Sequence, residues 1–453
     1  MKHPVPGRAI GVVGLGYVGI ATAVSFAQNG KKVVGYDVDD DRLMKLRKGE
    51  TPIFEPGLAP LVSRSVKSGR LRFVESLDEL LDACNVIFIA VPTPSSADGR
   101  IDLSFMKQAA EDLGFALARR PGWRLFVVKS TVVPGTTMND ITPIMITCSG
   151  STLGTGFSVA ANPEFLAEGT MVDDALHPSR IVIGVTDEKS KQLLKSIYSS
   201  FRSKIVVLSP TAAELVKYAS NAMLATRVSF ANEISRLAEK SGVDIYPVLD
   251  AVGMDPRIGG KFMRPGPGFG GSCFTKDIKA LIAWAKEGGM ETSLLLATLE
   301  VNDKQARHVV DLAREYSGGL KGKRVALLGL SFKPDTADTR DSRAYPIVEE
   351  LLWQDASVSL YDPVAWENFR RGLPHGIANE IGSRLFFTSS LKEALQGSDV
   401  AIIQCDWKEF RKAPPATWKL LKGKLVVDAR RTLDPKSLSR QGIRYVSVGL
   451  GSG

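Results

Sequence analysis

The stretch AIGVVGLGYVG, residues 9–19, decides how the first part of the chain folds. Its apolar run 9–13 predicts a buried strand, and the uncharged residues after Gly19 predict a helix. Between them, Gly14 permits a tight turn, Gly16 lets the backbone approach a pyrophosphate, and Gly19 allows close packing of helix against strand. The helix N-terminus adds N–H groups and a positive dipole for phosphates. The stretch therefore predicts a dinucleotide-binding unit.

Asp37 stands at the end of the next predicted strand, Lys32–Tyr36. A carboxylate at this place accepts hydrogen bonds from a ribose 2′-hydroxyl and repels a 2′-phosphate, which favours NAD over NADP. Arg42, one turn into the following helix, could tolerate the extra phosphate. A glycine-rich packing turn that binds no ligand is the alternative interpretation.

Short β-branched runs alternate with helical stretches at both ends of the chain, which predicts parallel sheets covered by helices on both faces. The expected strands are Ala9–Val13, Lys32–Tyr36, Val86–Val91, Leu125–Val128, Ser158–Ala160, Arg180–Gly184, Arg324–Leu328, Ser357–Tyr361, Val400–Gln404, Lys424–Asp428 and Tyr445–Val448. The expected helices include Gly19–Asn29, Asp39–Lys48, Leu103–Ala118, Thr211–Ser241, Ser272–Glu287 and Ser293–Tyr316. The fold class is therefore α/β, with two Rossmann-like doubly wound domains joined by a central helical domain.

The length of 453 residues fits three domains of about 150 residues each. We place them at 1–208, 209–317 and 318–453. A hydrophobic share of 44% with 24% charged residues excludes disordered, collagenous and disulfide-framework proteins. The net charge of +9 suits a phosphate-bearing partner. Because no Lys/Arg block or basic–aromatic repeat occurs, a small phosphorylated ligand is favoured over nucleic acid.

The cysteines and the uncharged N-terminal run bear on the cellular setting. Cys84, Cys148, Cys273 and Cys405 are far apart and form no CxxC pair, so neither zinc nor a disulfide framework is indicated. A reducing, cytoplasmic setting fits best. Residues 9–30 carry no charge and imitate a membrane anchor, but the glycine pattern explains them, so we expect neither export nor membrane insertion.

The segment GPGFGGSCFTKD, residues 266–277, predicts a reactive cysteine. Its glycines predict a mobile or tightly turned loop, Ser272 is a good N-cap, and Cys273 then takes the first helical position. A helix N-terminus favours the nucleophilic thiolate, and Asp277 lies on the same helix face as the sulfur. The alternative is a small buried residue that begins a core helix. We expect the other three cysteines to be packing residues.

The predicted long helix carries polar residues among apolar ones. Lys217 and Asn221 are four residues apart and share a face, so they could hold a developing oxyanion. The alternative is an ordinary solvated face. The polar positions are Glu214, Lys217, Asn221, Asn232 and Glu233.

A further candidate is the loop NPEFLAEG, residues 162–169, with carboxylates at Glu164 and Glu168. These could be a general base and a cofactor-contacting group, or a charged loop before a helix. The four histidines show no ligand spacing near this loop, so no metal site is predicted.

Taken together, these motifs identify a family. The chain resembles the nucleotide-sugar dehydrogenases, which include UDP-glucose and GDP-mannose 6-dehydrogenases, over nearly its whole length. The matching stretches, in order, are GLGYVG (14–19), VPTP (91–94), KSTVVPGT (129–136), NPEFLAEGT (162–170), HPSRIVIG (177–184), ELVKYASNAMLATR (214–227), DPRIGGKF (255–262), GFGGSCFTKD (268–277), LGLSFKPDTADTRDS (328–342) and VVDARR (426–431).

The resemblance implies a four-electron oxidation of a sugar C6 alcohol to the acid, with two NAD molecules used in succession. It implies that Cys273 captures the aldehyde as a thiohemiacetal, which is oxidised to a thioester and then hydrolysed. It further implies that Lys217 and Asn221 stabilise oxyanions and that Asp277 is the acid beside the cysteine. Thr131 and Glu164 match residues that place water and relay protons.

The resemblance also implies ligand contacts. NAD would meet Gly14, Gly16, Tyr17, Val18, Gly19, Asp37, Arg42, Thr93, Thr131, Glu168, Lys276 and Arg340. The sugar nucleotide would meet Glu164, Phe165, Leu166, Ala167, Glu168, Lys217, Asn221, Phe262, Met263, Arg264, Pro265, Gly266, Gly270, Phe274, Phe332, Lys333 and Arg430. Arg257 would reach the ligand of a partner subunit, which implies a homodimer through the central helices and leaves a higher oligomer open.

The substrate is predicted from the neighbouring sequence. DPRIG before KFM, and EGT followed by HPSRIVIG, resemble the UDP-glucose branch of the family. GDP-mannose or a UDP-N-acetylhexosamine remains an alternative substrate. A two-electron dehydrogenase, an epimerase and a non-catalytic nucleotide-binding protein remain alternative functions.

Overall fold

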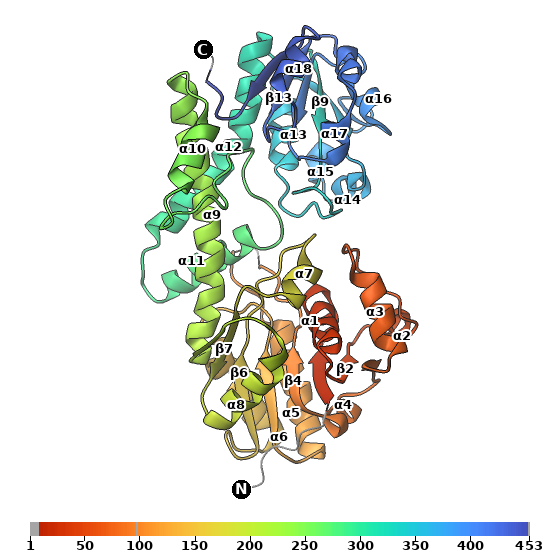
Figure 1. The fold of residues 1–453 in the computed structure, drawn as a ribbon, viewed down its shortest axis with the longest axis vertical. Coiled ribbons are helices and arrows are strands. Elements are labelled where there is room, and N and C mark those ends of the chain that lie inside the picture. The colour runs from red at the N-terminus through yellow and green to blue at the C-terminus, as the bar shows by residue number, and fades with distance from the viewer. Residues whose placement is uncertain (1–8, 97, 452–453) are drawn as a thin grey trace. The chain divides into compact units, whose positions relative to one another are not determined.

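The computed structural model describes residues 9–96 and 98–451, which form two compact units divided between Ser220 and Asn221. The division between the units falls inside one long helix, α9 (Pro210–Lys240). Each unit contains one sheet with helices packed on both of its faces (Figure 1). Most of the helical segment predicted to form the middle of the chain belongs to the second unit.

The first unit has an eight-stranded sheet in the order β3-β2-β1-β4-β5-β6-β7-β8. Its first six positions follow the order of a dinucleotide-binding sheet, in which ligands bind where the order reverses, between β1 and β4. Neighbouring strands are parallel except β6 and β7, which are antiparallel, so the all-parallel expectation is corrected at this edge. The strands are β1 (Ala9–Val13), β2 (Val33–Tyr36), β3 (Leu71–Phe73), β4 (Cys84–Ile89), β5 (Arg124–Val128), β6 (Phe157–Ala161), β7 (Ile181–Val185) and β8 (Ile205–Leu208).

Alternating strand residues of this sheet enter two separate cores. Phe88 of β4 packs with Phe26 in one core, whereas Ile87 packs with Leu113 in the other. The two cores require helices on both faces, as a buried parallel sheet does. The helices are α1 (Tyr17–Gln28), α2 (Asp40–Arg47), α3 (Leu58–Lys67), α4 (Leu77–Ala83), α5 (Ser104–Arg119), a π-helical turn (Thr137–Ile141), α6 (Thr142–Ser149), α7 (Met171–Leu176), α8 (Glu188–Ile197) and a 3₁₀ turn (Tyr198–Ser200).

The second unit has a six-stranded parallel sheet in the order β11-β10-β9-β12-β13-β14, the same dinucleotide-type order. The predicted fold class is thereby confirmed. The strands are β9 (Arg324–Leu328), β10 (Ser357–Tyr361), β11 (Leu385–Phe387), β12 (Val400–Ile403), β13 (Leu425–Asp428) and β14 (Arg444–Ser447). The helices are α10 (Ile245–Gly253), α11 (Phe274–Glu287), α12 (Ser293–Ser317), α13 (Ala344–Trp353), α14 (Trp366–Arg371), α15 (His375–Ala378), α16 (Leu391–Leu395), α17 (Lys408–Lys412), a 3₁₀ turn (Pro415–Leu420) and α18 (Pro435–Ser439).

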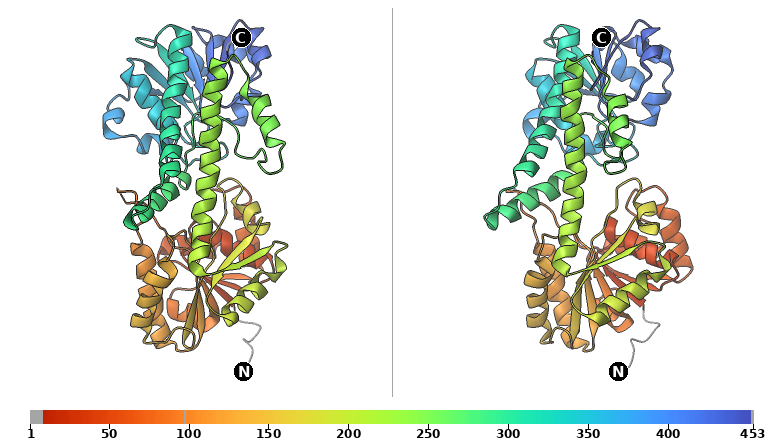
Figure 2. Two further views of the ribbon diagram at one scale, coloured as in Figure 1. Left: turned by 90° about the vertical axis from the view of Figure 1, so that its left-hand side faces the viewer. Right: turned by 60° about the vertical axis from the view of Figure 1, so that its left-hand side comes forward.

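The long helix α9 spans 31 residues without interruption (Figure 2). Its interior contains no glycine or proline, and its proline stands at the first position, where no intrahelical N–H bond is lost. Gly242 follows the helix with φ +69°, a conformation that suits glycine at a helix end. The helix was therefore predictable almost to the residue.

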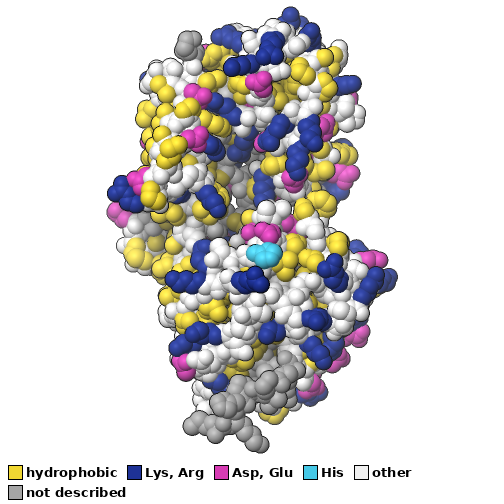
Figure 3. Space-filling model, in the orientation of Figure 1, with side chains coloured by type: hydrophobic (Ala, Val, Ile, Leu, Met, Phe, Trp, Pro, Cys, Tyr) yellow, Lys and Arg dark blue, Asp and Glu magenta, His cyan; other side chains and the backbone are white. Residues whose placement is uncertain are grey.

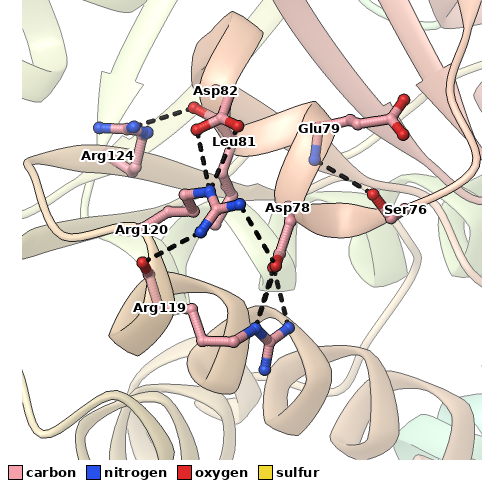
Figure 4. A network of polar contacts seen from close by, with 8 residues as sticks. All are labelled: Ser76, Asp78, Glu79, Leu81, Asp82, Arg119, Arg120 and Arg124. Atoms are coloured by element: carbon pink, nitrogen blue, oxygen red, sulfur yellow. Dashed lines mark hydrogen bonds and ion pairs between the residues drawn. The ribbon is translucent and has the colours of Figure 1, made fainter.

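A polar network joins α4, α5 and the start of β5 at the edge of the sheet where the parallel strands begin (Figure 4). Arg119 forms a bidentate hydrogen-bonded pair with the Asp78 carboxylate. This hydrogen bonding lowers the pKa of Asp78. Arg120 bonds Asp82 at 3.2 Å, and Arg124 bonds the carbonyl oxygen of Leu81 at 2.8 Å. Ligands bind at the opposite, carboxyl edge of such sheets, so we assign this network to stability.

The surface charge is mixed. On the face drawn in Figure 3, Lys and Arg side chains are scattered among acidic and apolar ones, and no continuous basic stripe crosses that face. Nucleic-acid binding proteins gather their basic residues on one face or along one helix. No helix within residues 9–96 and 98–451 is long and apolar enough to cross a membrane.

Candidate active site

The glycine turn after β1 has the geometry that a dinucleotide requires. A Cβ on Gly19 would stand 1.7 Å from the carbonyl oxygen of Gly14, so only glycine allows the helix this close. A Cβ on Gly16 would meet nothing within 4 Å, which leaves open space above the backbone at the start of α1. Gly14 has φ +83°. The turn therefore fits a pyrophosphate placed on the helix N-terminus.

Asp37 is buried at the end of β2 and is held by three donors. Its Oδ2 accepts from the backbone N–H of Leu15 at 2.5 Å and from Arg42 at 2.8 Å, and its Oδ1 accepts from the N–H of Asp39. Arg42 also pairs with the Asp39 carboxylate at 3.1 Å. Two carboxylates thus offset the charge of Arg42, which makes this position poorer for an extra phosphate and supports the preference for NAD.

The segment after β5 is fixed by side chains from α9 and from the β4 end. Thr93 donates to the carbonyl oxygen of Thr131 at 2.9 Å, which brings two predicted cofactor contacts together. Glu214 of α9 accepts from the N–H of Gly135 at 2.6 Å and from the N–H and hydroxyl of Thr137. Burial raises the pKa of Glu214 despite these bonds. Glu214 thus anchors the segment that carries Thr131.

Glu164 and Lys217 form a buried ion pair of 2.9 Å. Burial by itself would raise the pKa of Glu164, but Lys217, the N–H of Leu166 and the nearby Lys129 hold that pKa below its ordinary value. The Leu166 N–H lies 2.5 Å from the carboxylate. Glu164 is therefore ionised, and Lys217 is a fixed cation in a nearly closed environment, where charges interact strongly.

Lys129 is a second cation beside this pair, and sequence reasoning did not single it out. It donates to Asn162 Oδ1 at 3.0 Å and approaches the carbonyl oxygen of Pro163 at 3.5 Å. Asn162 also accepts from Tyr198 and donates to the carbonyl oxygen of Val182. The signal was present in the KST stretch after a strand, but the contact with Asn162 spans 33 residues of sequence.

Lys129 and Glu164 line a cavity of about 140 Å³ in the first unit. Phe165 and Arg180 also line it, and the Arg180 guanidinium lies 3.9 Å from the centre of the Phe165 ring. Desolvation, together with the nearby Lys217, lowers the pKa of Lys129 to about 8, although Glu164 opposes this effect. The charged side chains of the cavity wall thus include the cations Lys129 and Arg180 and the carboxylates Glu164 and Asp174.

Replacing Lys129 is expected to change how stability depends on pH. Because its pKa falls from 10.5 to about 8 in the folded chain, the unfolded chain binds more protons between these values. The free energy of unfolding of the wild type therefore rises across this window, by up to about 3 kcal/mol from this group. Urea unfolding between pH 8 and 10.5 should show that Lys129→Met lacks the rise. The exposed control Lys45→Met should keep it, and equal slopes in Lys129→Met and wild type would contradict the assignment.

In the second unit, Asn221 donates to Asp277 Oδ2 at 2.6 Å. Both side chains are buried, and the ammonium of Lys276 lies 2.7 Å from Asp277 Oδ1. Asp277 stands in the first turn of α11, where a carboxylate is favoured by the helix dipole. The structure thus brings together two residues that were singled out separately, the α9 amide and the acid of α11.

Cys273 is exposed and is itself the N-cap of α11. The helix begins at Phe274, one residue later than predicted, and Ser272 precedes the cap instead of forming it. The Cys273 carbonyl oxygen accepts the first helical bond, from the N–H of Asp277 at 2.9 Å. The sulfur still lies at the positive end of the helix, a position that favours a thiolate.

The glycine loop before Cys273 is tightly packed. A Cβ on Gly271, which has φ +87°, would lie 2.6 Å from the Phe332 ring, and one on Gly270 would lie 2.3 Å from the carbonyl oxygen of Asp341. Thr275 also donates to the Asp341 carboxylate. Of the two conformations considered, the tight turn is correct, and it places Phe332 against the approach to the cysteine.

Arg430, which follows β13 at the carboxyl edge of the second sheet, contacts the same glycine loop. It donates to the carbonyl oxygens of Gln404 at 3.0 Å and Gly268 at 3.2 Å, and burial lowers its pKa. A Cβ on Gly266 would lie 2.9 Å from the Arg430 guanidinium. A cation after β13 thus lies beside the predicted sugar-nucleotide loop.

The remaining predicted residues of the second unit are more dispersed. The Phe262 and Phe274 rings are 6.1 Å apart, whereas Met263 is buried in a small core with Ile245. Arg257 is exposed and pairs with Asp255, and Arg264 pairs with Asp250. Lys333 lies 5.5 Å from the Phe332 ring, and Arg340 pairs with Asp338.

The polar positions of α9 decide between the two interpretations given above. Glu214, Lys217, Asn221 and Asn232 are at most 6% exposed, so the solvated-face alternative is wrong for them. It holds only for Glu233, which is exposed. Within residues 9–96 and 98–451, no group of three His, Cys, Asp or Glu side chains is arranged to hold a metal ion.

Comparisons with known proteins agree with this geometry. Three models of the UDP-glucose/GDP-mannose dehydrogenase family match the chain: the NAD binding domain at residues 8–202, the central domain at 211–304 and the UDP binding domain at 326–435. The chain is 42% identical to a UDP-glucose 6-dehydrogenase of Haloferax volcanii over 97% of this chain and 99% of that protein.

Two solved structures are similar over almost their full lengths. A UDP-glucose dehydrogenase from Pyrobaculum islandicum has 39% identity and a TM-score of 0.88, covering 99% of this chain and 100% of that one. A UDP-D-ManNAc dehydrogenase from Pyrococcus horikoshii has 28% identity and a TM-score of 0.83, covering 98% and 100%. On the strength of the family models and these relatives, the chain belongs to the UDP-glucose/GDP-mannose dehydrogenase family and is an NAD-dependent oxidoreductase.

Proposed function

We propose that the chain oxidises UDP-glucose at C6 to UDP-glucuronate. The observation that carries the proposal is the pair of buried contacts on successive turns of α9, Lys217 with Glu164 and Asn221 with Asp277. They supply a fixed cation, an ionised carboxylate and an amide donor, which the two oxidations and the hydrolysis need. The full-length similarity to UDP-glucose dehydrogenases supports this substrate.

NAD, when bound at the glycine turn, supplies a hydride acceptor for each of the two oxidations. In the first oxidation, the C6 hydroxyl loses its proton towards the ionised Glu164. Lys217 and Asn221 then donate to the C6 oxygen and stabilise the alkoxide as the hydride leaves. The product of this step is the aldehyde.

In the second oxidation, the Cys273 thiolate adds to the aldehyde carbon and forms a C–S bond. Lys217 and Asn221 stabilise the thiohemiacetal oxygen, and loss of a second hydride gives a thioester. Glu164 first releases the C6 proton to solvent and is ionised again. Water placed by Thr131 and Glu164 then attacks the thioester carbon, Glu164 accepts the water proton, and the C–S bond breaks to restore the thiolate. Asp277 keeps Asn221 oriented through the 2.6 Å bond.

We further propose that the three predicted domains divide this work. Residues 1–208 bind NAD, 209–317 carry the cysteine and the long helix, and 318–453 bind the UDP moiety. The three matched family segments support this division. The inferred setting is the cytoplasm, in keeping with four cysteines that form no disulfide.

We also infer a homodimer through the central helices. Met223, Phe230 and Leu237 of α9 are 63%, 49% and 59% exposed and lie seven residues apart, so they form an apolar stripe along the helix. Such a stripe is typical of helix–helix interfaces. Light scattering of the purified chain gives the oligomeric state and would also detect a higher assembly.

A UDP-N-acetylhexosamine is the second candidate substrate, favoured by the similarity to the Pyrococcus protein. The deciding experiment incubates the purified enzyme with UDP-glucose, UDP-N-acetylhexosamines and GDP-mannose, each with NAD and with NADP, and measures reduced cofactor per sugar. We expect two NADH per UDP-glucose. One NADH per sugar would indicate a two-electron dehydrogenase, and none with any sugar would indicate an epimerase or a non-catalytic protein.

A further inference from the structure

The irregular segment 51–57 between α2 and α3 contains one buried carboxylate, that of Glu55. Its Oε2 accepts from the backbone N–H of Gly169 at 2.9 Å, and its Oε1 accepts from that of Met171 at 2.8 Å. These contacts span 114 and 116 residues of sequence. The side chain is 7% exposed, so water does not compete freely for either bond.

Both donors lie where the Glu164 loop (residues 162–170) runs into α7. Gly169 has φ +81°, and Met171 is the first residue of that helix. The residue at the N-cap position, Thr170, makes no side-chain capping bond. The first N–H groups of a helix lack intrahelical partners and favour a negative charge. Glu55 therefore takes the role of a cap that the local sequence does not provide.

Two other hydrogen bonds at this end of the loop are local. Ala167 and Thr170 both bond the carboxylate of Asp174, but Asp174 belongs to α7 and moves with the loop. Lys217 holds the loop at its beginning through Glu164. Glu55, by contrast, is a carboxylate from outside the loop and α7 that bonds the far end of the loop.

Apolar packing and one further bond keep the segment around Glu55 in place. Ile53, Leu166 and Val172 pack against the same core, so the segment, the loop and α7 share one apolar surface. The hydroxyl of Tyr17 in the cofactor turn donates to the carbonyl oxygen of Phe54 at 3.4 Å. One short segment therefore contacts both the cofactor turn and the Glu164 loop.

We propose that Glu55 is a positioning residue for substrate binding, because its carboxylate holds the end of the loop that carries Glu164 and Glu168. The proposal rests on the function proposed above. Glu55 itself touches no reacting atom. Its loss frees the end of the loop, so binding of the sugar nucleotide must order that end again, and affinity for the sugar falls more than affinity for NAD.

The test compares Glu55→Ala, Glu55→Gln and the control Glu50→Gln, in which an exposed carboxylate of the same region is changed. In Glu55→Ala, we expect KM for UDP-glucose to rise at least about tenfold, with KM for NAD and kcat within about threefold of wild type. Glu55→Gln keeps one acceptor oxygen and should fall between Ala and wild type. Glu50→Gln should match the wild type.

A second readout does not depend on the substrate. Hydrogen exchange of the unliganded enzyme should be faster in residues 162–176 of Glu55→Ala than in wild type, and unchanged in β1 and α5. Faster exchange in an enzyme that proves inactive on UDP-glucose would support the role of Glu55 in holding the loop but would overturn the proposed substrate. Unchanged exchange, or parallel losses in kcat, both KM values and thermal stability, would overturn the positioning role.

Discussion

The Cys273→Ala variant is expected to lose steady-state oxidation of UDP-glucose by at least about 1,000-fold, because no other group in the proposed mechanism can hold the aldehyde covalently. The sulfur stands at the N-cap of α11, exposed to ligand and at the positive end of the helix. Alanine keeps the packing of that turn but removes the nucleophile. NADH formation followed at its absorbance band measures the effect.

The control for this experiment is Cys148→Ala. Cys148 is only partly exposed, and burial raises its pKa, so its thiol is a poor nucleophile and its loss should leave the rate unchanged. An aldehyde analogue of the substrate should add to the wild type and to Cys148→Ala, but not to Cys273→Ala, as read by mass spectrometry. Two NADH per sugar from Cys273→Ala at the wild-type rate would contradict covalent capture.

The Lys217→Met variant is expected to lower kcat by about 100- to 1,000-fold, the usual effect of removing one donor to a developing oxyanion. Methionine has nearly the same length, so it fills the buried space without the charge. Lys217→Arg keeps the charge with a different donor geometry and should recover part of the rate. Steady-state kinetics at saturating NAD and sugar measures both variants.

The same substitution has a pH signature that a purely structural role would not produce. Lys217 is the main group that holds the pKa of Glu164 below its ordinary value against the effect of burial. Without this cation that pKa rises, so the acid limb of the pH–rate profile should move to higher pH. The exposed lysine at the end of the same helix, changed in Lys240→Met, should leave the profile in place. An unshifted acid limb in Lys217→Met would show that Glu164 is not the titrating base.

Elements whose sequence carries a strong local pattern, such as a glycine turn or a regular apolar run, could be predicted from neighbouring residues alone. The glycine turn, the strands of both sheets and α9 depend on neighbouring residues, and most bounds agree with the prediction to within one or two residues. The strands that were not predicted, β3, β8 and β11, are short and lie at the edges of their sheets, where fewer residues are buried and the apolar signal is weaker. The antiparallel pairing of β6 and β7 depends on the path of the chain between them, which has no local pattern.

The candidate site was only partly predictable for the same reason. Cys273 and Asp277 were found because a glycine loop and a helix start are local features. Lys129 and Glu55 were not found, because each is defined by partners far away in the sequence. A solvated face stayed open as an alternative for the α9 residues, because nothing nearby in the sequence reveals the loops that cover them.

The continuous winding of α9 has a consequence for how this chain can vary. Each added or removed residue turns the remainder of a helix by about 100°. Asn221 and Asn232 meet Asp277 and the N–H of Gly266 on separate turns, so one insertion between them would break at least one of these contacts. We therefore expect relatives to differ in length at surface loops and to keep the number of residues between these two positions of the helix constant.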